Sequence, residues 1–337
     1  MQTNPWTDAA LLDHLQKAVY LELWTIPLYL TAAYSLQVPG TDPAHPPQQV
    51  IVRGNKNPNR SREQLAFNNI YSIAVQEMLH LELASNLFNA LFASKGLSPK
   101  FTGEWAPRYD RFPSWIAGNK PVQCGPVNPE QMALLASIET PEPKSDGAPD
   151  GPRETYDSIG QFYKSIEQGL QERWSALYKP DVDPHRQKNE FGNSDYRNDY
   201  YTGFSSVISG DSDTALKLAN GVLQAIIGQG EGNRGPLIEA DLRPEDANDV
   251  EDRFSHFSRF RMVQAMLKFG GPLKTYPTTT KSKELASAQN QLTDGFQSLL
   301  TALEKGYAGN GQLDLTPMWT LPQQIVSVWA AGGVPQF

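Results

Sequence analysis

Apolar residues between positions 69 and 92 recur at the spacing of an amphipathic helix, and two ionisable residues lie inside the apolar stripe. The stripe includes Ile70 and Ile73, and Glu77 and His80 occupy positions on the same face. Both side chains are therefore predicted to point into the protein interior. Because burying an ionised carboxylate is costly without a compensating partner, this pair needs an explanation, and a metal ion is the leading one.

A second acidic residue is predicted to be buried in the N-terminal helix, which we expect over residues 7 to 34. Thr7 suits the N-cap position, and Glu22 lies in the middle of the apolar stripe of this helix. The apolar members of the stripe are Leu15, Val19 and Ile26. The sequence thus predicts two helices that each turn a carboxylate toward the interior.

Helical periodicity continues through the rest of the chain, interrupted by segments rich in Pro, Gly and Asn. The helix that carries Glu77 should begin after Ser61 as N-cap and run to about residue 94. Long loops are expected over residues 38 to 60 and over most of 97 to 152. Further helices are predicted over residues 129 to 137, 155 to 178, 211 to 229, 244 to 269, 283 to 304 and 317 to 331.

These elements predict an all-α fold, a four-helix bundle with long loops and additional C-terminal helices. Residues 1 to 275 are expected to form a metal-binding bundle, and residues 276 to 337 a helical extension packed on it. In the last helix, Trp319, Ile325 and Trp329 are predicted to pack against the bundle.

Composition narrows the class of protein. The chain has 337 residues and a formal net charge of −8, with acidic and basic residues intermixed, so neither nucleic acid nor an anionic membrane is expected as a partner. The N-terminus lacks the features of a signal peptide, and no apolar run is long enough to span a membrane. We therefore expect a soluble, cytoplasmic protein, and the sequence leaves its oligomeric state open.

Cysteine and histidine are scarce, which restricts the ligands available to a metal. The single cysteine, Cys124, excludes a disulfide framework or a thiolate-rich site within one chain and is interpreted as an ordinary loop residue. The chain has five histidines. Of these, His14 lies one residue off the stripe of its helix and is interpreted as structural, whereas His256 lies within a stripe.

Three further residues are candidate metal ligands, each with an alternative interpretation. His256 could be a histidine satisfied within the core, and Arg253, three residues before it, takes the place where a second Glu-x-x-His motif would have Glu. Glu231 lies in the string GQGEG at a helix end and could instead be a solvated cap residue. Glu167 flanks the apolar face of its helix and could be a ligand or a rim carboxylate.

The spacing of Glu77 and His80 supports the metal hypothesis, because residues three apart on a helix project side by side. Carboxylate bundles that bind two iron or manganese ions place Glu-x-x-His on two helices and single Glu residues on the other two. The full candidate set is Glu22, Glu77, His80, Glu167, Glu231 and His256. Mixed oxygen and nitrogen ligands favour iron, one or two ions, with manganese as the alternative.

Six blocks in order resemble a known family. They are the sequence around Glu22, the helix of Glu77, SIETPEP, SIGQFYKSIEQGL, GQGEG and SHFSRF. Together they resemble the ferritin-like family typified by iminophenyl-pyruvate dimer synthases, which couple two indole-pyruvate imine units in violacein and rebeccamycin-type biosynthesis. The resemblance covers residues 8 to 270. It implies metal-binding roles for Glu22, Glu77, His80, Glu231 and His256.

The functional hypothesis is a metal-dependent oxidase or oxygenase of secondary metabolism. A metal centre with open positions could bind dioxygen and oxidise a small organic substrate, which the resemblance implies to be derived from an amino acid. Glu22, Glu77 and His80 would serve it as ligands. Two alternatives stay open: an iron-binding protein of the ferroxidase or storage type, and a metal-free bundle that acts as an interaction module.

Overall fold

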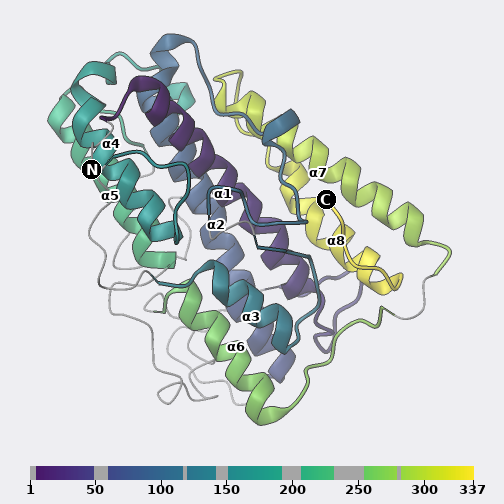
Figure 1. Ribbon diagram of the computed structural model, residues 1–337. Helices are drawn as coiled ribbons and strands as arrows, with labels where there is room; N and C mark the ends of the chain where they lie inside the picture. The colour runs from purple at the N-terminus through teal and green to yellow at the C-terminus, as the bar shows by residue number, and fades with distance from the viewer. Residues whose placement is uncertain are drawn as a thin grey trace.

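The computed structural model describes residues 5–48, 60–116, 120–141, 151–191, 206–230, 254–278 and 282–337. Within these residues the protein is helical, with isolated bridges and no β-strand, as predicted (Figure 1). The α-helices are α1 (Asp8–Tyr34), α2 (Arg62–Phe92), α3 (Pro129–Ile138), α4 (Ile159–Leu177), α5 (Ser212–Gly230), α6 (His256–Gly270), α7 (Leu285–Tyr307) and α8 (Thr316–Ala330). Short 3-10 turns cover Ala93–Lys95, Gly103–Trp105 and Pro184–Arg186.

Helices α1 and α2 form the central pair of the molecule (Figure 1). Every residue of α1 from Leu21 to Tyr34 is buried, and α2 is buried along most of its length. A helix that is covered on all sides belongs to the centre of a protein rather than to its surface. Glu22 and Glu77 each lie near the middle of their helix, so the arrangement places both carboxylates deep in the bundle.

Two shorter helix pairs cover the central pair, one after the other along its length. In Figure 1, α4 and α5 pack together over one half, and α3 and α6 pack together over the other. The four ends that face the middle of the central pair are the C-terminal ends of α3 and α5 and the N-terminal ends of α4 and α6. This break in the outer layer is where the candidate site lies.

Helix α1 starts where the sequence predicts, because Thr7 caps it. The Thr7 side chain accepts a hydrogen bond from the backbone N–H of Ala10 at 3.1 Å. Ser61 caps α2 in the same way, accepting from the backbone N–H of Gln64 at 3.1 Å. Each cap satisfies a backbone donor that has no partner within its helix. Both predicted caps are thus confirmed.

Thr7→Ala is expected to lower the free energy of unfolding by about 1 kcal/mol, the usual cost of losing a side-chain N-cap. Chemical denaturation followed by circular dichroism would measure it. Thr301→Ala is the control, because the exposed Thr301 hydroxyl donates to the backbone of its own helix and caps nothing. An equal loss in both variants would contradict the capping role.

Other predicted boundaries differ from the observed ones. Helix α4 begins at Ile159, after Ser158 as N-cap, rather than at residue 155, because the buried Tyr156 packs against His14 before the helix starts. The first part of the helix predicted over residues 244 to 269 lies outside the described residues, and α6 is described from His256 onward. Among the described helices, none is both long and apolar enough to cross a membrane.

Helices α7 and α8 pack together on the opposite flank, and α8 contacts α1 (Figure 1). Trp329 is fully buried, and its indole N–H donates to the backbone oxygen of Thr31 in α1 at 3.1 Å. Ile325 is also fully buried. The prediction for Trp319 is wrong: its side chain is 67% exposed, because the neighbouring Met318 takes the inward position on that turn of α8.

Candidate metal centre

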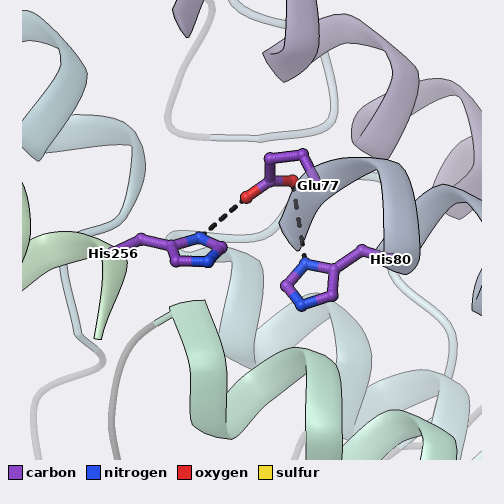
Figure 2. Close-up of side chains that lie close together, drawn as sticks. All are labelled: Glu77, His80 and His256. Carbon is purple, nitrogen blue, oxygen red and sulfur yellow. Dashed lines mark ion pairs between the residues drawn. The ribbon is translucent and has the colours of Figure 1, made fainter. Parts of the chain in front are cut away.

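Glu77, His80 and His256 form a buried group that is able to hold a metal ion (Figure 2). One ligand atom from each residue lies within 4.8 Å of the other two. The Glu77 carboxylate lies between the imidazoles: Oε1 is 2.7 Å from Nδ1 of His256, and Oε2 is 3.7 Å from Nδ1 of His80. All three side chains are almost completely removed from solvent. The group therefore combines ligands from α2 with the first residue of α6.

Two more buried carboxylates complete the surroundings of the imidazoles. Oε2 of Glu22, in α1, is 3.4 Å from Nδ1 of His80. Oε1 of Glu139, the C-cap residue that follows α3, is 3.6 Å from Nδ1 of His256. Both carboxylates are buried. Three carboxylates and two imidazoles thus converge from α1, α2, α3 and α6.

The helix ends that meet over the middle of the central pair contribute to this site. Glu139 at the end of α3 approaches the end of α5, where a Cβ added to Gly230 would lie only 3.2 Å from its Oε2 atom. A larger residue at position 230 would crowd this carboxylate.

Hydroxyl groups hold each carboxylate in place. The Tyr163 hydroxyl donates to Glu22 Oε1, the Tyr29 hydroxyl donates to Glu139 Oε1 at 2.5 Å, and the Thr25 hydroxyl donates to Glu77 Oε2 at 2.9 Å. These donors satisfy part of each carboxylate and fix its orientation. Such outer contacts are typical of metal sites, where they orient the ligands and tune their basicity.

The environment shifts the pKa values of the ionisable groups. Burial raises the pKa of Glu22, and the nearby negative charge of Glu77 adds to the effect. Burial would also raise the pKa of Glu77, but the neighbouring His256 and His80 hold it well below its usual range. Although burial alone lowers it, the neighbouring carboxylates of Glu22 and Glu77 raise the pKa of His80 to about 10.

The pKa of His256 is raised in the same way, because the charge of Glu77 outweighs the effect of burial. Both shifts show that the cluster favours positive charge at its centre. Protons on the imidazoles can supply that charge, and so can a metal ion that replaces them.

The donor set fits a metal ion. Nδ1 of His256 has no hydrogen-bond partner among the described residues, although it lies 2.7 Å from a Glu77 oxygen. Close approach without hydrogen-bond geometry is what two ligands of one cation show. Carboxylate oxygens and imidazole nitrogens together are ligands that suit iron, manganese or zinc.

The structure brings together four of the six residues proposed from the sequence: Glu22, Glu77, His80 and His256. Glu167 lies elsewhere: its side chain is partly exposed, and its Oε2 accepts a long hydrogen bond of 3.5 Å from the Gln224 amide. Glu167 points toward α5, because apolar residues occupy the face of α4 that packs inward. Glu231 lies outside the described residues.

Sequence reasoning missed Glu139 as a site residue. The sequence predicts a helix that ends at Ser137, which places Glu139 in the loop that follows. In the structure α3 continues to Ile138, and Glu139 lies on the same face as Met132 and Leu135, at intervals of three and four residues. That spacing is the signal in the sequence, and a helix extended by two residues, from Ser137 to Glu139, would include it.

His14 and Cys124, which the sequence analysis does not include in the metal site, lie outside the cluster of carboxylates and imidazoles. His14 is buried, with Nδ1 2.7 Å from the backbone oxygen of Ala10 and Nε2 2.9 Å from the Tyr156 hydroxyl. Cys124 is partly buried, and burial raises the pKa of its thiol to about 12. A thiol with so high a pKa is protonated at neutral pH and is a poor nucleophile.

A carboxylate and histidine cluster at the centre of a helical bundle is the arrangement found in the carboxylate bundles that bind iron or manganese. The model of the ferritin-like family matches residues 15–265, which include all five residues of the cluster. The chain therefore belongs to the ferritin-like family.

A solved structure supports the fold along the whole chain. The crystal structure of a ferritin-like protein from Caulobacter vibrioides is 24% identical in sequence, with a TM-score of 0.70, and the alignment covers 99% of each chain. At this level of identity the likeness shows the fold. No curated protein sequence matches the chain.

Proposed function

We propose that Glu22, Glu77, Glu139, His80 and His256 hold one or two iron ions, and that the protein is an oxidase or oxygenase. The observation that carries the proposal is the convergence of three carboxylates and two imidazole Nδ1 atoms in a centre closed to solvent. Such a set has an excess of negative charge that a divalent or trivalent cation offsets. Mixed oxygen and nitrogen ligands favour iron or manganese over calcium or magnesium.

The residues of the chain would serve this chemistry in distinct ways. Bound iron supplies the one-electron redox chemistry with which dioxygen can be activated. The carboxylates neutralise the charge of the ion, and the hydroxyl groups of Tyr29 and Tyr163 hold Glu139 and Glu22 by hydrogen bonds. Burial of the site keeps water from competing with the reaction.

The substrate class is proposed from the resemblance in sequence. The residue blocks shared with iminophenyl-pyruvate dimer synthases favour a small, amino-acid-derived substrate of secondary metabolism. One of these blocks, SIETPEP, contains Glu139, which the structure brings to within 3.6 Å of His256. Glu139 therefore belongs both to a sequence block that carries the resemblance and to the cluster of carboxylates and imidazoles.

Two measurements on one preparation test the proposal. Elemental analysis of protein purified without chelator should find iron bound to the chain. Oxygen uptake by the iron-loaded protein should then increase on addition of indole-3-pyruvate with ammonia, which form the imine. Uptake that follows only the amount of ferrous iron added would indicate a storage or ferroxidase protein instead.

If no metal is bound before or after incubation with ferrous iron, the proposal is wrong. The remaining alternative is then a metal-free bundle that acts as an interaction module. A variant with an unaltered site, Glu82→Gln, is the control for both measurements. Glu82 is fully buried in α2, and its carboxylate accepts from the backbone N–H groups of Glu190 and Phe191, on a different face of the helix.

A further inference from the structure

Two buried glutamines contact the outer edges of the two imidazoles. Oε1 of Gln229, in the last turn of α5, lies 2.7 Å from Nε2 of His80. Oε1 of Gln76, in α2, lies 3.0 Å from Nε2 of His256. Both glutamines are 1% exposed. Each imidazole therefore has one nitrogen on a glutamine and the other facing carboxylates.

An amide oxygen can only accept a hydrogen bond, so the ring nitrogen opposite it must carry the hydrogen. In a neutral imidazole the other nitrogen then has the lone pair. For both histidines that nitrogen is Nδ1, the atom that faces the carboxylates of Glu22, Glu77 and Glu139. The same tautomer is thus selected twice, by two different helices.

We propose that Gln76 and Gln229 are positioning residues that keep the ring hydrogen of His256 and His80 on Nε2, so that Nδ1 is the nitrogen that releases its proton and binds the metal. The inference rests on the proposed metal site. A glutamine suits this task because it is a neutral acceptor and adds no negative charge to a centre that already contains three carboxylates. The residues that orient ligands in this way also make them more basic.

The opposite amide orientation would have a distinct consequence. A glutamine NH2 group turned toward Nε2 would donate to it and place the ring hydrogen on Nδ1. That N–H would then donate to the carboxylate of Glu22 or Glu77. The histidine and the carboxylate would thus be hydrogen-bonded to each other, with no place for a cation between them. In the metal-loaded protein, the ring nitrogen that keeps its hydrogen therefore distinguishes the two orientations of the glutamine amide.

The first test measures metal affinity with zinc(II) as probe, by competition with a chromogenic chelator. Gln76→Leu and Gln229→Leu should each weaken the binding by about 10- to 100-fold, the usual effect of removing the partner of a ligand histidine. Gln76→Glu and Gln229→Glu keep an oxygen that accepts from Nε2, so these variants should retain most of the zinc(II) affinity of the unaltered protein.

Gln16→Leu is the matched control. Gln16 is also buried in a central helix, and its amide makes two hydrogen bonds with the backbone of Lys100, outside the metal centre. It should bind zinc(II) as the unaltered protein does. The proposal would be overturned if Gln16→Leu weakened zinc(II) binding as much as the site variants do. It would also be overturned if neither Gln76→Leu nor Gln229→Leu weakened zinc(II) binding.

The second test needs no variant of the glutamines. In protein labelled with ¹⁵N at histidine and loaded with zinc(II), the shifts of His80 and His256 should show a metal-bound Nδ1 and a protonated Nε2. Binding through Nε2 would overturn the inference and leave the metal site intact. Failure of the unaltered protein to bind zinc(II) would overturn the metal site and the inference with it.

Discussion

Glu77→Gln should abolish the retention of metal by the protein, and His80→Ala should do the same. The Glu77 carboxylate lies between both imidazoles, so its loss removes the ligand common to the two sides of the group. His80 supplies one of only two imidazoles among the described residues of the centre. Elemental analysis after gel filtration would measure retention.

Equally buried residues outside the centre provide the controls. Glu82→Gln alters a carboxylate of the same helix that is also fully buried, and His14→Ala alters a buried histidine whose partner is Tyr156. Both should retain metal at the level of the unaltered protein. All four variants should keep a helical circular-dichroism spectrum. Full metal occupancy in Glu77→Gln and His80→Ala would show that the assignment at α2 is wrong.

Trp329→Ala should lower the free energy of unfolding by about 3–5 kcal/mol, the usual cost of truncating a buried tryptophan. Trp329 is fully buried where α8 meets α1, and its indole N–H donates to the backbone oxygen of Thr31. The variant therefore loses both the packing of a large ring and a buried hydrogen bond. Urea unfolding followed by circular dichroism would measure the change.

Trp319→Ala is the control on the same helix. Its side chain is 67% exposed, so the expected change is within about 0.5 kcal/mol. A similar loss in both variants would contradict the docking of α8 through Trp329. Limited proteolysis of Trp329→Ala would also test the predicted division of the chain at residue 275, since a separate extension should be cleaved while the bundle stays intact.

Periodicity in the two longest helices predicts the inward direction of three residues of the cluster. Glu22, Glu77 and His80 each lie in an apolar stripe of a long helix, and all three are buried in the structure. Those helices are long and apolar enough for the pattern to be unambiguous, so the direction of each side chain follows from its position. The N-caps at Thr7 and Ser61 were equally clear.

The prediction for His256 rests on its place in an apolar stripe, because its helix carries Arg253 where a second Glu-x-x-His would have Glu. Only the structure shows that its ring comes within 2.7 Å of Glu77. Glu139 lies two residues beyond the predicted end of its helix, and neither glutamine stands out in the sequence as part of the site. A residue just past the end of a helix has periodic neighbours on one side alone, and a buried amide follows no pattern that separates it from other polar residues.

The sequence by itself determined that the chain is helical and that acidic and imidazole groups point inward from its two longest helices. Tertiary structure alone decided which helices are neighbours, and so brought the ends of α3 and α5 and the starts of α4 and α6 to the middle of the central pair. The physical reason is that periodicity fixes a side chain relative to the axis of its own helix. Distances between helices depend on how whole surfaces pack together.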